Sequence, residues 1–381
     1  MSQRLAFYIH IPYCVARCGY CDFNTYTPKE LHSDSVESMS QRYINAAIKE
    51  IESASKEVGP AVVPSIFFGG GTPSLMTGTQ ISSVIGAIRD RFEMENNCEI
   101  TIEANPDSLT SEFLALTRNA GVNRISIGMQ SSMPHVLAAL DRTHHPENVA
   151  QAVKMVREHG FEHCSVDLIY GVPGESIEDW SETVQAALSL EIDHLSAYAL
   201  IVEKGTKLAA RIRSGELVIP PDDETAAKYE IVDEMCEAKG LQWYELSNWS
   251  KNGAQCRHNI SYWDGSFWWG IGPGAHSYFN GVRWWNVKHP DSYQKLINEG
   301  NSPILEREEL SEINRQDESI MLKIRMREGI QIDSLNNSQQ DQVKSFLTSG
   351  HIDNHAWANG KLVLTRSGRL IADRIVREIL V

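Results

Sequence analysis

The chain has 381 residues, of which 42% are hydrophobic and 22% are charged, and its formal net charge is −15. This length favours one large core domain with a smaller appended module. The acidic balance argues against nucleic acid as a partner, because a phosphate backbone requires a concentrated basic surface. The sequence has no apolar run of about 18 residues that could span a bilayer, and no secretory signal pattern at its start. We therefore expect a cytoplasmic protein without a transmembrane segment, and peripheral membrane contact stays open.

Six short segments with strand composition are spaced along the first 201 residues of the chain. They cover residues 5–12, 65–68, 99–103, 124–128, 165–170 and 195–201. Segments with helical periodicity lie between them, most clearly at 43–55, 81–92, 149–159 and 180–190. Such alternation produces a parallel sheet with right-handed crossovers. The sequence therefore predicts an α/β fold built on a partial (β/α)6 barrel, since a closed barrel would need two more units.

Three cysteines, Cys14, Cys18 and Cys21, follow the first predicted strand within eight residues. Three thiols this close can face one point only if the backbone loops around it, as in a set of metal ligands. Structural zinc takes four protein ligands, whereas a cubane iron–sulfur cluster held by three thiolates keeps one iron open. The alternatives are zinc completed by His10 or another histidine, and three incidental buried thiols. The other four cysteines are scattered, so no disulfide framework is predicted.

The loops that follow the other predicted strands carry residues suited to ligand binding. In order they are Gly69-Gly70-Gly71-Thr72-Pro73, Glu103-Ala-Asn105-Pro106, Gln130-Ser131, and Asp167 with residues 170–174. Strand C-terminal ends of a (β/α) barrel meet at one mouth, so we expect these loops beside the cysteines. Each motif alone has a plainer interpretation, as a turn or as a solvated carboxylate. Together they offer backbone groups, carboxylates, an amide and, at Arg142, a guanidinium, which can hold ribose hydroxyls and a carboxylate.

The alternation ends near Glu203, and residues 204–206 and 219–223 read as a hinge. Residues 243–285 then contain seven of the nine tryptophans, together with the segment His258-Asn-Ile-Ser-Tyr262-Trp263. One interpretation is an aromatic core or a lid over the barrel. The other is a site for a planar macrocycle whose iron accepts an imidazole. The last 80 residues combine helical patterns with a β-hairpin and resemble a winged-helix arrangement, for which we expect a lid or docking role rather than DNA binding.

These motifs together resemble the oxygen-independent coproporphyrinogen III oxidase family of radical S-adenosylmethionine proteins, over nearly the whole chain. The resemblance rests on the cysteine loop and on Tyr8-Ile-His-Ile-Pro12, Phe67-Phe-Gly-Gly-Gly-Thr-Pro73, Glu103-Ala-Asn-Pro106, Arg124-Ile-Ser-Ile-Gly-Met-Gln-Ser131 and Asp167-Leu-Ile-Tyr-Gly-Val-Pro-Gly174. It implies a 4Fe-4S cluster held by Cys14, Cys18 and Cys21, with S-adenosylmethionine on the open iron. It further implies an S-adenosylmethionine site lined by Tyr8, Tyr20, Gly70, Gly71, Thr72, Glu103, Gln130, Arg142 and Asp167.

That family has an oxidase branch and a haem-chaperone branch. The oxidases carry a further cysteine where this sequence has Phe23, and a longer arm than the 13 residues that precede Cys14 here. The segment beginning at His258 matches the His-Asn-x-x-Tyr-Trp motif, which resembles the haem-binding signature of the chaperones. The resemblance therefore implies a protein that binds haem and passes it to an unidentified acceptor protein. His258 would be the iron ligand or lie beside it, with His276 or Cys256 as alternatives.

The alternative function is enzymatic. An electron from the cluster would cleave S-adenosylmethionine, and the resulting radical would start oxidative decarboxylation of coproporphyrinogen propionates. For either function the sequence predicts three regions: a radical S-adenosylmethionine partial barrel at 1–204, an aromatic-rich haem-binding segment covering the barrel at 205–300, and a winged-helix-like domain at 301–381.

Overall fold

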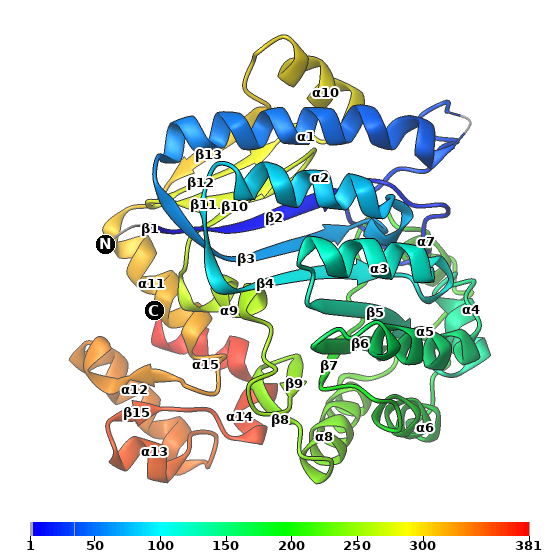
Figure 1. Ribbon diagram of the computed structural model, residues 1–381. Helices are drawn as coiled ribbons and strands as arrows, with labels where there is room; N and C mark the ends of the chain where they lie inside the picture. Colours follow the sequence, from blue (N-terminus) through cyan, green and yellow to red (C-terminus); the bar gives the residue numbers. More distant parts are fainter. Residues whose placement is uncertain (1–2, 34, 381) are drawn as a thin grey trace.

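The computed structural model describes residues 3–33 and 35–380, and its centre is an open, curved sheet (Figure 1). Six neighbouring strands of this sheet are parallel and follow chain order: β2 (Ala6–Ile11), β3 (Ala61–Gly70), β4 (Glu93–Ala104), β5 (Arg124–Gln130), β6 (His163–Tyr170) and β7 (His194–Ala199). The helices between them are α1 (Val36–Val58), α2 (Gly78–Arg89), α3 (Ser111–Ala120), α4 (Pro134–Ala139), α5 (Pro146–Glu158) and α6 (Ile177–Leu188). The predicted six-unit partial barrel is confirmed, and it is open rather than closed.

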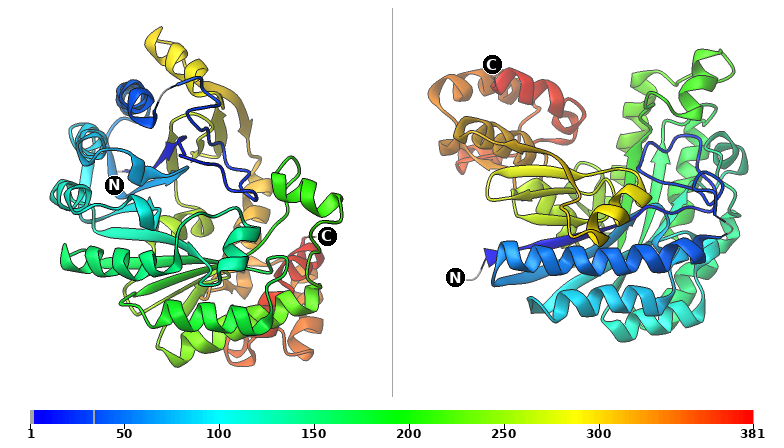
Figure 2. Two further views of the ribbon diagram at one scale, coloured as in Figure 1. Left: turned by 90° about the vertical axis from the view of Figure 1, so that its right-hand side faces the viewer. Right: turned by 90° about the horizontal axis from the view of Figure 1, so that it is seen from above.

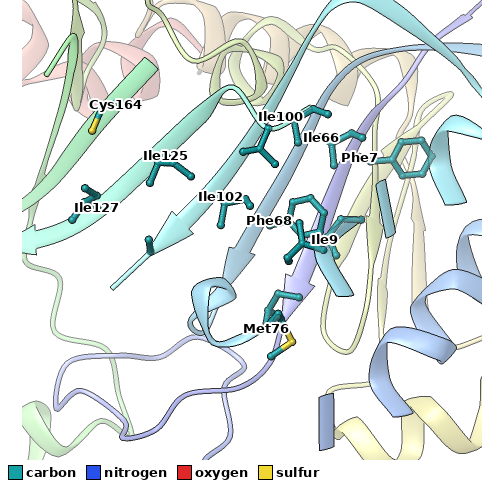
Figure 3. Packing of buried hydrophobic residues seen from close by; sticks show 14 of the residues in the cluster. Phe7, Ile9, Ile66, Phe68, Met76, Ile100, Ile102, Ile125, Ile127 and Cys164 are labelled. Carbon is teal, nitrogen blue, oxygen red and sulfur yellow. The ribbon is translucent and has the colours of Figure 1, made fainter. Parts of the chain in front are cut away.

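Side chains alternate between the two faces of these strands, as the period of two in a strand requires. One face packs beneath the helices in a single hydrophobic core, which includes Phe7, Ile9, Ile66, Phe68, Ile100, Ile102, Ile125 and Ile127 (Figure 3). The other face carries Tyr8, Glu103 and Asp167 toward the inside of the barrel. The strands thus bury one apolar side against helices and keep their chemically active residues on the other.

The sheet continues beyond the six parallel strands on both edges. β10 (Trp268–Ile271) pairs in parallel with β2, and β11 (His276–Phe279), β12 (Val282–Asn286) and β13 (Ile304–Glu309) follow antiparallel to one another. At the opposite edge, β9 (Asn248–Ser250) and β8 (Gln242–Glu245) extend β7, while the short β1 (Gln3–Arg4) pairs with β3. Much of the tryptophan-rich segment is therefore part of the barrel sheet itself. The predicted boundaries at residues 204 and 300 stay predictions.

Helix α9 (Arg257–Asp264) is held beside the barrel strands by a carboxylate. Glu99 of β4 accepts hydrogen bonds from the backbone nitrogen atoms of Arg257 and His258, at 3.1 and 3.0 Å, and pairs with the buried guanidinium of Arg124. A carboxylate at this end of a helix satisfies its free N–H groups and favours the positive end of the helix dipole. The remaining helices of this half are α7 (Lys207–Arg213), α8 (Asp222–Ala238) and α10 (Pro290–Asn298).

The C-terminal part forms a second hydrophobic core of its own. Its elements are α11 (Glu312–Lys323), β14 (Ile330–Gln331), α12 (Asn337–Thr348), α13 (Asn354–Ala358), β15 (Lys361–Leu362), α14 (Arg366–Leu370) and α15 (Ala372–Ile379). β14 and β15 pair into a two-stranded sheet, as the predicted α-rich, winged-helix-like arrangement requires. Within the part of the chain that the structure describes, no helix has both the length and the apolarity needed to cross a bilayer.

Candidate functional site

The cysteine loop leaves the C-terminal end of β2 and is closed at its base by backbone hydrogen bonds. Cys14 donates to the carbonyl oxygen of Tyr26 at 3.0 Å, and Tyr26 donates back to Pro12 at 2.7 Å. The glycine-rich loop after β3 supports it, because the backbone nitrogen of Thr72 donates to the Tyr13 carbonyl oxygen at 2.8 Å. The loop therefore has a defined shape at the barrel mouth, which is the end of the sheet that faces the viewer in the left view of Figure 2.

The three thiols of this loop lie close enough to influence one another. The pKa of Cys14 is raised to about 11, mainly because the thiol is buried. A hydrogen bond from the Thr72 hydroxyl, 3.7 Å from the sulfur, lowers this pKa, whereas the neighbouring Cys21 and Cys18 raise it. The guanidinium of Arg142 reaches the sulfur of Cys18 at 3.6 Å. A hydroxyl donor and a guanidinium beside these sulfurs stabilise the thiolate form, which is the form that binds a metal.

A single zinc ion fits this site poorly. Among residues 3–33 and 35–380, no three His, Cys, Asp or Glu side chains converge closely enough to hold one metal ion. His10, the sequence-based candidate for a fourth ligand, already contacts the Tyr8 hydroxyl at 3.1 Å and the Asn24 carbonyl oxygen at 2.9 Å through its two ring nitrogens. A cubane cluster held by three thiolates needs no fourth protein ligand, so it does not require His10.

The glycines after β3 are needed because the backbone of two loops approaches closely there. Gly70 has a φ of +107°, and a Cβ atom on it would lie 2.6 Å from the His10 ring. A Cβ atom on Gly71 would lie 2.4 Å from the carbonyl oxygen of Tyr13. Only glycine meets both conditions without strain. The backbone nitrogen of Gly70 in turn donates to Glu103 at 3.3 Å, which joins the glycine loop to β4.

Two carboxyl groups, Glu103 and Asp167, face the same interior. The pKa of Glu103 is raised to about 8, mainly by burial and also by the nearby charge of Asp167, while the Gly70 hydrogen bond opposes the shift. Burial likewise raises the pKa of Asp167, although it accepts a hydrogen bond from the Ser126 hydroxyl at 2.8 Å. Two carboxyls that resist ionising together are suited to a ligand that brings hydroxyl donors or positive charge.

The part of the barrel mouth next to β5 contains three further predicted site residues, Gln130, Arg142 and Tyr20. Gln130 has a φ of +63° at a break in the β5–β6 register, and such strain in a residue other than glycine concentrates at functional sites. Arg142 donates to the Gly128 carbonyl oxygen at 2.9 Å, while its buried Nε has no partner within the described residues. Burial, with Cys18 adding to it, raises the pKa of Tyr20. An unpaired guanidinium N–H is the group expected to bind a ligand carboxylate.

His258 lies deeper, inside the barrel. It is only 1% exposed, its Nδ1 is 3.0 Å from the Ser65 hydroxyl, and its Nε2 is 2.9 Å from that of Tyr262. Its ring centroid is 6.4 Å from that of Tyr8, so the histidine motif adjoins the predicted S-adenosylmethionine site. Burial lowers the pKa of His258 to about 4. The alternative ligand Cys256 is also buried and contacts Glu99 at 3.4 Å.

Asn24 is a residue of this site that sequence reasoning missed. Its amide nitrogen donates to the carbonyl oxygens of Pro273 and Lys288, at 2.9 and 2.8 Å, and so ties the cysteine loop to the segments after β10 and β12. The only feature of the sequence that could have indicated this role is the position of Asn24, three residues after Cys21. Its partners are about 250 residues away in the chain, where no local pattern connects them.

Comparisons with known proteins agree with this geometry. Residues 8–187 match the Radical SAM superfamily model. Among solved structures, coproporphyrinogen III oxidase (HemN) from Escherichia coli superposes with a TM-score of 0.83 at 20% identity, covering 99% of this chain and 90% of that one. The fold and the cysteine loop therefore define a protein of the radical S-adenosylmethionine class.

The sequences of relatives narrow this class to one family. "Heme chaperone HemW" of Mycobacterium tuberculosis (strain ATCC 25618 / H37Rv) is 44% identical over 379 residues, which are 100% of this chain and 95% of the relative. "Heme chaperone HemW" of Bacillus subtilis (strain 168) is 33% identical over 377 residues and covers 97% of each chain. The chain belongs to the HemW family, and the expected assignment to that branch is confirmed.

Proposed function

We propose that this protein is a haem chaperone, which binds haem and transfers it to an acceptor protein while carrying a 4Fe-4S cluster and S-adenosylmethionine. One observation supports the proposal: Tyr8 lies beside both Glu103 and His258, so the predicted S-adenosylmethionine site and the histidine motif adjoin. Tyr8 connects them, because its ring neighbours His258 at 6.4 Å and its side chain lies beside Glu103. The names of the relatives in the HemW family support the choice of haem as the cargo.

Each residue of the mouth has a task in this proposal. Cys14, Cys18 and Cys21 hold the cluster, which when bound supplies an open iron for the amino and carboxylate groups of S-adenosylmethionine. The backbone of Gly70 and Gly71, with Thr72, lies against the methionine moiety. Glu103 and Asp167 accept hydrogen bonds from the ribose hydroxyls, and Gln130, Arg142 and Tyr20 hold the end of S-adenosylmethionine that carries the carboxylate.

The seven free cysteines and the low-potential cluster fit a reducing compartment, so we place the protein in the cytoplasm.

The test is anaerobic reconstitution of the full chain with iron and sulfide, followed by titration with ferric haem. We expect about four irons and four sulfides per chain, a spectral change on adding S-adenosylmethionine, and saturable haem binding. Glu103→Gln should weaken the response to S-adenosylmethionine and leave the cluster content unchanged. Absence of haem binding would refute the proposal. Conversion of coproporphyrinogen to protoporphyrinogen, with matching formation of deoxyadenosine, would establish the oxidase alternative.

A further inference from the structure

We infer that helix α7 and the turn at residues 140–142 together hold the middle of the cysteine loop, and that Asp141 and Lys207 are positioning residues for the cluster ligand Cys18. The turn follows α4 and α7 follows β7, and the two elements meet at the barrel mouth (Figure 1). The inference rests on the proposed function, because it assigns residues that support the same cluster. Neither Asp141 nor Lys207 is among the site residues predicted from the sequence.

Gly19, between the ligands Cys18 and Cys21, is the point at which the loop is held. Its backbone nitrogen donates to the carbonyl oxygen of Leu140 at 3.1 Å, and its own carbonyl oxygen accepts from the backbone nitrogen of Leu208 at 2.8 Å. Leu208 lies in the first turn of α7, where a backbone N–H has no partner within the helix. The turn and α7 therefore each form a hydrogen bond with the same loop residue.

The side chain of Asp141 adds a third contact to Gly19. A Cβ atom on Gly19 would lie 2.3 Å from Oδ2 of Asp141, so this carboxylate lies directly against the loop backbone. The same oxygen pairs with Nζ of Lys207 at 2.9 Å. Arg142, the next residue of the turn, reaches the sulfur of Cys18 at 3.6 Å. The ion pair thus joins α7 to the turn that places a guanidinium beside a cluster ligand.

The backbone conformation of Asp141 indicates that its side chain has a specific task. Asp141 has a φ of +54° where α4 ends, and the nitrogen of Arg142 donates back to the carbonyl oxygen of Leu137 at 2.9 Å. Helices often end with a residue in this left-handed conformation, and glycine adopts it at the least cost. Such strain in a residue other than glycine concentrates at functional sites. What an aspartate contributes here, and a glycine would not, is the contact with Gly19 and Lys207.

Helix α7 is itself fixed well enough to hold the turn. The hydroxyl of Thr206 caps its start by accepting a hydrogen bond from the nitrogen of Ala209 at 3.1 Å. Nη1 of Arg211 donates to the carbonyl oxygen of Ala139, the last residue of α4, at 3.2 Å. The side chain of Leu208 is buried. Contacts with α4 and with the loop therefore come from successive positions of one short helix.

The experiment measures the alkylation rate of each cysteine in the cluster-free full-length protein, by mass spectrometry. Asp141→Gly should increase the rates of Cys18 and Cys21 by several-fold. Its urea midpoint should not fall, because glycine adopts the left-handed conformation without strain. Cys14 is an internal control: its backbone hydrogen bond to Tyr26 lies outside the contacts described here, so its rate should stay unchanged.

Lys207→Gln separates positioning from a simple effect of charge. Removing a cation disfavours the reactive thiolate, and removing an anion favours it, so charge alone would change the rates in opposite directions in Lys207→Gln and Asp141→Gly. The inference predicts faster alkylation in both, by about twofold in Lys207→Gln, as suits an exposed ion pair. Lys207→Arg should restore the original rates. Lys204→Gln is the matched control, because Lys204 is exposed and forms no ion pair with the residues that the structure describes.

The reconstituted protein gives a second readout. Asp141→Gly should release iron to a chelator several-fold faster than the unmodified protein, and the electron paramagnetic resonance spectrum of its reduced cluster should be broader, because Cys18 is held less rigidly. Unchanged alkylation of Cys18 and Cys21 in Asp141→Gly, or rates that change in opposite directions in the two variants, would overturn the inference. If the unmodified chain forms no cluster, the proposed function fails instead, and the alkylation rates still decide whether these residues hold the loop.

Discussion

The imidazole of His258 stacks on the phenyl ring of Phe67, with centroids 5.1 Å apart and planes at 24°. The Tyr262 ring meets the same imidazole edge-on at 5.2 Å, and its hydroxyl is within hydrogen-bond distance. A histidine packed in this way, with both nitrogens satisfied, joins α9 to β3 inside the barrel. Its side chain therefore contributes to stability, whatever its role toward haem.

His258→Ala should lower the free energy of unfolding by about 2 to 4 kcal/mol, because it leaves a cavity and two unpaired hydroxyls. Urea unfolding of the cluster-free protein, followed by tryptophan fluorescence, measures this loss. His355→Ala, on an exposed surface, should stay within about 0.5 kcal/mol of the unmodified protein. An unchanged urea midpoint in His258→Ala would contradict the packing role described here.

The contact between Asn24 and Gly274 makes a second prediction. Gly274 has a φ of +72°, and a Cβ atom on it would lie 2.6 Å from the Asn24 amide nitrogen. Gly274→Ala should therefore displace the amide and loosen the cysteine loop, and Asn24→Ala should do so directly. In cluster-free protein, both variants should show several-fold faster alkylation of Cys14, Cys18 and Cys21, and both should retain less iron after reconstitution.

Gly253→Ala controls for backbone strain in this experiment, because Gly253 has a φ of +80° and nothing lies within 4 Å of its added Cβ atom. The double variant of Asn24 and Gly274 should be no worse than the single ones, since removing the amide makes room for the new methyl group. Equal alkylation rates in Gly274→Ala and Gly253→Ala would show that the Asn24 contact does not hold the loop.

Glu50 predicts a pH dependence of stability. Its buried carboxyl accepts hydrogen bonds from the Tyr293 hydroxyl at 2.5 Å, the Gly272 nitrogen at 2.8 Å and the Asn286 amide at 2.7 Å. Burial nevertheless raises its pKa from 4.5 to about 7. The folded protein therefore keeps a proton that the unfolded chain releases, so the contribution of Glu50 to stability falls as pH rises from about 4.5 to about 7.

Between pH 6 and pH 8 this loss should amount to about 1 kcal/mol, given about 1.4 kcal/mol per pKa unit. Glu50→Gln cannot ionise, so its free energy of unfolding should change less over this range than that of the unmodified protein. Urea unfolding at both pH values measures the difference. A Glu50→Gln variant with the same pH dependence as the unmodified protein would show that Glu50 is ionised in the folded state throughout.

Arg369 predicts how the C-terminal part is held on the barrel. Its guanidinium lies 4.3 Å from the Trp243 ring centroid and binds both carboxylate oxygens of Asp233, at 2.9 and 2.7 Å. Asp233 is 4% exposed and keeps Arg366 and Trp249 as partners when Arg369 is removed, so the loss is that of one charge-assisted contact. Arg369→Ala should cost about 1 to 3 kcal/mol and separate the unfolding of the C-terminal part from that of the barrel in calorimetry.

Arg374→Ala is the matched control, because that arginine pairs with Glu378 on an exposed helix surface. Its loss should have little effect on either transition. A single calorimetric transition in Arg369→Ala, at the temperature of the unmodified protein, would show that other contacts hold the C-terminal part.

By itself, the sequence determined the six parallel units and the mouth where their loops converge. Strand and helix periods are local properties, and the parallel direction of strands joined by helical crossovers then places Gly70, Glu103 and Asp167 at one end of the sheet. Only the tertiary structure decided that β10 pairs with β2, that Asn24 ties the cysteine loop to residues 273 and 288, and that His258 is enclosed while His276 is exposed. These outcomes depend on hydrogen bonds and packing between segments more than 190 residues apart, which no local pattern encodes.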